Sequence, residues 1–215
     1  MIQTLPMLVA AVMAMASPMA LAQDAKAGES KAAMCIGCHG MPGYQATFPE
    51  IHRVPMISGQ SAKFIEASLQ AYKKGERKHP SMRGVAASLS DKDMADLAAF
   101  YEQHGGKSTA AAETPAAAPA NVAELLTKGA CASCHGANFS KPIDPSYPKI
   151  AGQHHDYLFV ALKSYKVKDQ AVLGRSNAIM AGQVAQFKPA ELKAIANYLG
   201  SLPGELKTVP QPKFR

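Results

Sequence analysis

Tryptophan is absent from this chain of 215 residues, and seven tyrosines with seven phenylalanines are few aromatic residues for the one or two domains that the length allows. We therefore expect something other than aromatic side chains to fill part of the core. Beyond residue 22 the sequence has no apolar run long enough to span a membrane. It also has no alternating run long enough for a sheet, which favours an all-α protein.

The N-terminal segment lacks charge from Leu5 to Ala22 and closes on Ala-Leu-Ala-Gln, the small-x-small pattern of a signal-peptidase site. We interpret residues 1–22 as a secretory signal, so that the mature chain starts near Gln23 and lies in the periplasm. The alternative is an uncleaved anchor, because eighteen mostly apolar residues are close to the length that spans a bilayer. The protein would then be membrane-associated.

The sequence contains one unit twice, and this predicts two homologous domains. The Cys-x-x-Cys-His motifs lie 96 residues apart, Pro-Met-Ile-Ser-Gly-Gln matches Pro-Lys-Ile-Ala-Gly-Gln 93 residues later, and the C-terminal segments match at an offset of 98. The predicted organisation is a first domain over 23–106, an Ala/Pro-rich linker over 107–120, a second domain over 121–206 and a tail over 207–215.

Each unit has apolar residues at helical spacing in its middle and last segments. A shorter helix is expected before each Cys-x-x-Cys-His, the second opened by Asn121. Ser90 with Asp93, and Pro189, are start signals for the last helices. The prediction is about three helices per domain, with these stripes: Ile65, Leu69 and Tyr72, matched by Leu158, Leu162 and Tyr165; and Met94, Leu97 and Tyr101, matched by Leu192, Ile195 and Leu199.

The four cysteines belong to the two Cys-x-x-Cys-His motifs. Disulfides, a zinc knuckle or thiol redox chemistry would each use cysteine pairs. However, 93 residues separate the two pairs, the βαβ context of a thioredoxin is missing, and none of these readings explains a histidine after each pair. Covalent haem explains it and supplies the missing core. We predict two haem c, bound through Cys35 and Cys38 and through Cys131 and Cys134, with His39 and His135 as iron ligands.

The sixth iron ligand follows by elimination. After its motif the second unit has a single methionine, Met180, and its counterpart 98 residues earlier is Met82. His79, His154 and His155 compete for the role, but none recurs at an equivalent position, and we interpret them as surface histidines.

Two pairs of residues near these ligands also recur. Arg77 and Arg175 each lie five residues before the proposed methionine, and the fixed fork of a guanidinium suits a haem propionate. The alternative for both is an arginine that faces solvent. Pro55 and Pro148 each follow the haem histidine.

With these motifs the chain resembles the class I c-type cytochromes, and its doubled arrangement is similar to the dihaem cytochrome c4 family. The resemblance implies one His/Met-ligated haem per domain and two domains related by a pseudo-twofold axis, with propionates facing each other. It further implies that the carbonyls of Pro55 and Pro148 accept the imidazole N–H of His39 and His135.

Saturation of each iron by His and Met leaves no position for a small-molecule substrate, so the sequence favours an electron carrier over an enzyme. We expect transfer from a quinol-oxidising complex to a terminal oxidase or reductase. One alternative is the dihaem subunit of a dehydrogenase such as a flavocytochrome. A dihaem peroxidase would need a haem with a displaceable or absent sixth ligand, which the two methionines argue against.

Charge is spread unevenly along the chain. Ten Lys/Arg face nine Asp/Glu over 23–106, a net +1, whereas twelve face six over 120–215, a net +6. An exported protein meets little nucleic acid, and the lysines are scattered. We expect a monomer whose second domain meets an acidic redox partner first, through Lys163, Lys166 and Lys168. The alternative is that net charge only serves solubility.

Overall fold

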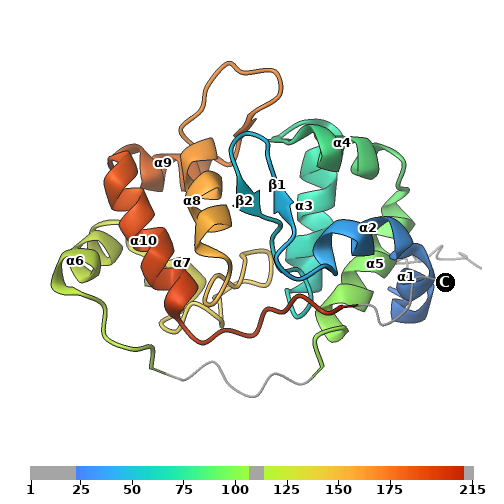
Figure 1. Ribbon diagram of the computed structural model, residues 1–215, viewed down its shortest axis with the longest axis horizontal. Coiled ribbons are helices and arrows are strands. Elements are labelled where there is room, and N and C mark those ends of the chain that lie inside the picture. Colours follow the sequence, from blue (N-terminus) through green and yellow to red (C-terminus); the bar gives the residue numbers. More distant parts are fainter. Residues whose placement is uncertain (1–22, 107–113, 211–215) are drawn as a thin grey trace, which may run out of the picture.

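The computed structural model describes residues 23–106 and 114–210; the expected signal segment and part of the linker lie outside them. The first half contains helices α1 (Ala25–Lys31), α2 (Ala33–His39), α3 (Ala62–Lys74), α4 (Pro80–Ala87) and α5 (Asp91–Gln103). The second half contains α6 (Ala120–Lys128), α7 (Cys131–His135), α8 (His155–Ser164), α9 (Ala178–Ala185) and α10 (Pro189–Ser201) (Figure 1).

The all-α prediction is confirmed. Strands occur only as four two-residue segments in the described residues: β1 (Gln45–Ala46) with β2 (His52–Arg53), and β3 (Arg77–Lys78) with β4 (Gly174–Arg175). The three expected helices are α1, α3 and α5 in the first half and α6, α8 and α10 in the second. Two more helices per half carry the cysteine motifs and the methionines, and they are too short to show an amphipathic period.

The first core forms where α3 and α5 pack together and α1 crosses α5. This crossing is close: a Cβ on Gly28 would lie 2.1 Å from the carbonyl oxygen of Asp96. The Asp96 carboxylate is buried there and accepts hydrogen bonds from the ammonium groups of Lys31 and Lys92, both at 2.8 Å. Helix α1 is therefore held to α5 by packing and by charge.

The second core lies between α8 and α10, with α6 against α10. Its last helix begins as expected, with Pro189 in the first turn, and the matching helix α5 has the Ser90 and Asp93 capping box. The expectation for Asn121 was wrong. Helix α6 begins at Ala120, one residue earlier, directly after Pro119, and no side chain caps it.

The two halves contact each other reciprocally, as a pseudo-twofold axis requires. The amide of Gln60 is bonded to the backbone N–H and C=O of Lys149, both at 3.0 Å. The amide of Gln153 is bonded in the same way to Met56, at 3.0 and 2.8 Å. Gln60 and Gln153 are equivalent in the repeat, and so are Met56 and Lys149.

The ladder of β3 and β4 joins the two halves at the axis itself. Arg77 pairs with Arg175 in antiparallel register, and these are equivalent positions in the repeat. A residue that pairs with its own equivalent lies beside the symmetry axis. The two arginines are therefore brought together by the pairing of the domains.

The segment that follows α10 crosses back to the first half (Figure 1). The N–H of Lys207 donates to the carbonyl of Ser58 at 3.0 Å, and its ammonium donates to Gly105 at 2.8 Å. Gly59 permits this approach, because its φ is +85° and a Cβ would lie 2.7 Å from the carbonyl oxygen of Glu205. The tail expected at 207 therefore includes residues that strap the two halves together.

Candidate haem sites

Helix α2 brings its two thiols and its imidazole together. Cys35 and Cys38 are three residues apart, which places them on one face of the helix, and His39 follows at the end. Helix α7 arranges Cys131, Cys134 and His135 in the same way. No disulfide joins the four cysteines, and burial raises the pKa of the Cys35 and Cys131 thiols.

All six residues line one cavity of about 690 Å³, which reaches into both halves of the molecule. This volume lies within the range of roughly 300–1,000 Å³ that is typical of cofactor sites. Most of the lining is apolar, from the facing sides of α3 and α8 and from the last helices. The cavity therefore lies beside the apolar core of each half, where a cofactor would fill the space that side chains leave empty.

The two motif histidines are oriented by backbone carbonyls. His39 Nδ1 lies 2.8 Å from the oxygen of Pro55, and His135 Nδ1 lies 3.0 Å from that of Pro148. A carbonyl oxygen only accepts, so Nδ1 carries the proton in both rings and Nε2 keeps its lone pair for a metal. Burial lowers the pKa of both imidazoles, which favours the neutral form that binds iron.

Met82 and Met180 also line the cavity, on the short helices α4 and α9. Each helix is capped by the residue three positions before its methionine. His79 Nδ1 accepts the Met82 N–H at 3.5 Å, a long contact, and Asn177 Oδ1 accepts the Met180 N–H at 2.9 Å. The side-chain caps position both methionines at the cavity wall.

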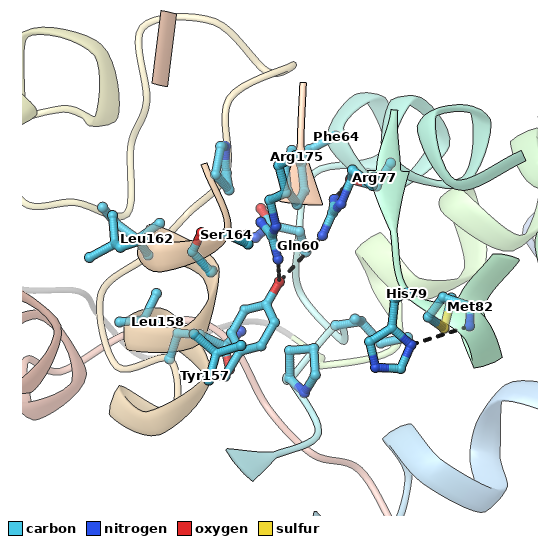
Figure 2. A pocket seen from close by; sticks show the side chains of 18 of the residues that line it. Gln60, Phe64, Arg77, His79, Met82, Tyr157, Leu158, Leu162, Ser164 and Arg175 are labelled. Carbon is cyan, nitrogen blue, oxygen red and sulfur yellow. Dashed lines mark hydrogen bonds between the residues drawn. The ribbon is translucent and has the colours of Figure 1, made fainter. Parts of the chain in front are cut away.

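The interpretation of His79 as a surface residue was therefore wrong. His79 is half-buried and lines the cavity beside Met82, where it caps α4 (Figure 2). A cap needs only a side-chain acceptor, so histidine and asparagine take the same role in the two halves. Among the other candidates, His155 is exposed, whereas His154 is half-buried where α8 begins.

Arg77 and Arg175 are half-buried and lie together at the junction of the two halves. Both guanidiniums donate to the hydroxyl oxygen of Tyr157, from Nη2 at 3.4 Å and 3.1 Å respectively (Figure 2). Burial disfavours ionisation of Tyr157, yet the two positive charges hold its pKa below the ordinary value. The comparison of the two repeats does not single out Tyr157, because its equivalent in the first half is Phe64.

The lysines of the expected docking face are mostly engaged in contacts within the molecule. Lys163 forms an ion pair with Glu50 of the first half, with 2.6 Å between Nζ and Oε1. The ammonium of Lys166 donates to the carbonyls of Ala185 and Phe187. Lys168 is exposed, and it is the one lysine of the three that has no partner among the described residues. Charge reversal at Lys163 would therefore weaken the junction as well as any docking face.

The donor set fits two covalent haems. Each half presents two thiols, an imidazole with a free Nε2 and a thioether to the same cavity. The Arg77 Nε is buried and has no hydrogen-bond partner among the described residues, so the junction has a donor to spare for a carboxylate. Cys35, Cys38, Cys131 and Cys134 would form the thioethers, and His39, Met82, His135 and Met180 would ligate the irons.

Comparison with known proteins decides the family. Over 198 residues the chain is 31% identical to cytochrome c4 of Azotobacter vinelandii, an alignment that spans 84% of this chain and 90% of the relative. The chain belongs to the cytochrome c4 family. The family model for cytochrome c matches residues 119–203.

A solved structure and a further relative agree with this. The crystal structure of reduced recombinant cytochrome c4 from Pseudomonas stutzeri superposes with a TM-score of 0.64 at 27% identity, covering 85% of this chain and all of that one. The "Thiosulfate dehydrogenase electron acceptor" of Stutzerimonas stutzeri is 29% identical over 81% of this chain and 82% of its own length. As a cytochrome c4 family member, the chain is a dihaem electron-transfer cytochrome with two haem c and redox proteins as partners.

Proposed function

We propose that the protein is a periplasmic carrier that takes single electrons from a quinol-oxidising complex and passes them to a terminal oxidase or reductase. One observation carries the proposal: in both halves a histidine and a methionine line the same cavity as a cysteine pair. If the histidine and the methionine of each half both bind the iron, no coordination position is left for a substrate. A closed site favours a carrier over an enzyme that acts on a small molecule.

The chain's own residues supply a rigid, apolar setting for each site. The Pro55 and Pro148 carbonyls fix the imidazole rings, and the caps of α4 and α9 fix the methionines. Haem c supplies one-electron chemistry, and a methionine ligand raises its potential relative to a second histidine. Fixed ligands keep the geometry similar in both oxidation states, which suits a site that gains and loses electrons repeatedly.

The periplasmic location rests on the uncharged segment before Gln23, which lies outside the described residues. Among the residues that the structure describes, no helix has the length and hydropathy needed to cross a bilayer. Fractionation of cells and N-terminal sequencing test this part. We expect a periplasmic protein that starts near Gln23, and an intact N-terminus in the membrane fraction would contradict it.

A second candidate function is the role of electron acceptor or subunit for a dehydrogenase. The relative named as a thiosulfate dehydrogenase electron acceptor favours it. Both functions use the same sites, so only the electron donor separates them.

The experiment compares two donors with the same purified dihaem protein. Membranes supplied with a quinol, with and without an inhibitor of quinol oxidation, test the first donor; thiosulfate with a purified thiosulfate dehydrogenase tests the second. Carrier function predicts inhibitor-sensitive reduction by quinol and reoxidation by membranes under oxygen. Reduction by thiosulfate with its dehydrogenase, but not by quinol, would support the second candidate. Reduction by neither donor would overturn both.

A further inference from the structure

The contact of Arg77, Arg175 and Tyr157 at the junction of the halves is an unusual arrangement. Two guanidiniums, each carrying a full positive charge, are held side by side by the pairing of β3 with β4. Like charges at short range repel, and although each guanidinium lies over a tyrosine ring, an anion nearby would stabilise the pair further. Among the described residues the group that bridges the two is the neutral Tyr157 hydroxyl.

An account of donors and acceptors shows what the junction lacks. A phenol oxygen has two lone pairs and one hydrogen. The N–H groups of Arg77 and Arg175 occupy both lone-pair directions of Tyr157, which leaves its O–H hydrogen without an acceptor among the described residues. The buried Nε of Arg77 also has no partner there. The junction thus holds two donors without partners among the described residues and two positive charges, all of which suit a carboxylate.

The arrangement is not symmetric, although the backbone around it is. Tyr157 lies on α8, and the equivalent position on α3 is Phe64. The ring of Phe64 lies 5.7 Å from the guanidinium carbon of Arg77, as the ring of Tyr157 does from that of Arg175. The first half therefore supplies the same aromatic surface without the hydroxyl.

We propose that Tyr157 is a positioning residue of the electron-transfer centre: its O–H donates a hydrogen bond to a haem propionate that Arg77 and Arg175 hold at the junction. The inference rests on the two haem c of this family and does not depend on which protein donates the electrons. Tyr157 supplies from one half a hydrogen bond that the other half cannot supply. It therefore sets a difference between two otherwise equivalent sites.

The sign of the effect follows from electrostatics. The oxidised iron carries one more positive charge than the reduced iron and is stabilised more by a nearby negative carboxylate. A hydrogen bond donated to that carboxylate weakens its field at the iron, so the Tyr157 hydroxyl favours the reduced state. Because a hydrogen bond to a charged group is about twice as strong as a neutral one, we expect about a threefold to tenfold effect on the reduction equilibrium.

The test is a potentiometric titration of the purified dihaem protein as wild type and as Tyr157→Phe. In the variant, the ratio of reduced to oxidised haem at a fixed applied potential should fall about threefold to tenfold for at least one haem. The Met-to-iron absorption band is recorded in the same samples, and it should stay intact because Tyr157 is not an iron ligand. Titration of the isolated protein involves no partner, so its result is independent of the carrier assignment.

Two further variants keep the inference falsifiable. Tyr198→Phe is the matched control, because that hydroxyl donates to the carbonyl of Ala116, away from the junction, and its loss should leave both equilibria unchanged. Phe64→Tyr adds a hydroxyl at the equivalent position and should shift an equilibrium toward the reduced state, which decides the case if Tyr157→Phe fails to fold. Shifts of less than about twofold in the folded Tyr157→Phe protein, or no shift in Phe64→Tyr where only that variant folds, would overturn the inference.

Discussion

Replacement of Gln153 by alanine tests how strongly the two halves are held together. The Gln153 side chain is 4% exposed and makes three hydrogen bonds: two with the backbone of Met56 across the junction, and one from the N–H of His154. Truncation would leave partly buried backbone groups of Met56 and His154 without these partners. At about 1 kcal/mol for each bond, and more where a buried group is left unsatisfied, we expect a loss of roughly 2–4 kcal/mol in the free energy of unfolding.

The symmetry of the junction makes the prediction sharper. Gln60 is also 4% exposed and makes the same three contacts, with Lys149 N–H and C=O and with Ser61 N–H. Gln60→Ala should therefore destabilise the protein by a similar amount. Gln70→Ala is the control, since Gln70 donates to Asp91 within the first half at an exposed contact, and its replacement should cost less than about 0.5 kcal/mol.

The assay is equilibrium denaturation of the dihaem protein, followed by haem absorption and by circular dichroism. A weaker junction should also couple the unfolding of the two halves less tightly, so that the single transition broadens in the variants. Two results would refute the reasoning. One is a cost for Gln153→Ala no larger than that of the Gln70 control, and the other is a cost confined to only one of the two equivalent glutamines.

The iron ligands, the buried Asp96 and the exposed Lys168 can each be tested by substitution. Met180→Ala should remove about half of the weak sulfur-to-iron band of the ferric protein and Met82→Ala the other half, as read from the visible spectrum; an intact band in either variant would reject that ligand. Hydrogen bonds from two lysines lower the pKa of Asp96 to about 2, so the stability it contributes is present above the ordinary value of 3.8 and is lost as pH falls toward 2. Asp96→Asn should flatten this part of the acid denaturation curve, and an unchanged curve would contradict the assignment. Lys168→Glu should slow reaction with an acidic acceptor severalfold at low salt and flatten its salt dependence, whereas Lys74→Glu in the first half should do less; equal effects would reject the second half as the docking face.

The sequence was sufficient to predict what repeats along the chain. The two motifs, their spacing and the matched helical stripes indicated the all-α fold and the family, because repeated patterns are local and can be compared directly. Met82 and Met180 were selected in the same way, and the structure places both at the cavity wall with the motif histidines. Their roles as iron ligands stay predictions that the spectra above would test.

Features that depend on the meeting of distant residues were missed. In the loop over 40–54, Arg53 and Glu50 form ion pairs with Asp156 and Lys163 of the other half. The place of Tyr157 between two arginines arises only when β3 pairs with β4. Such contacts are set by the packing of two domains, which no pattern within either domain encodes.

Some contacts near the two haem sites are equivalent in the two halves, and others are not. Equivalent residues make equivalent contacts at the motif histidines, at the two glutamines and in the backbone pairing of the two arginines, so these contacts cannot distinguish the two haem sites. Any difference between the sites must arise where the repeat breaks. The breaks close to the cavity include Tyr157 against Phe64 and Tyr101 against Leu199, and in each of these pairs only one residue carries a hydroxyl. Polar substitutions of this kind are therefore where a difference between the two redox centres is to be sought, and Tyr157→Phe tests one of them directly.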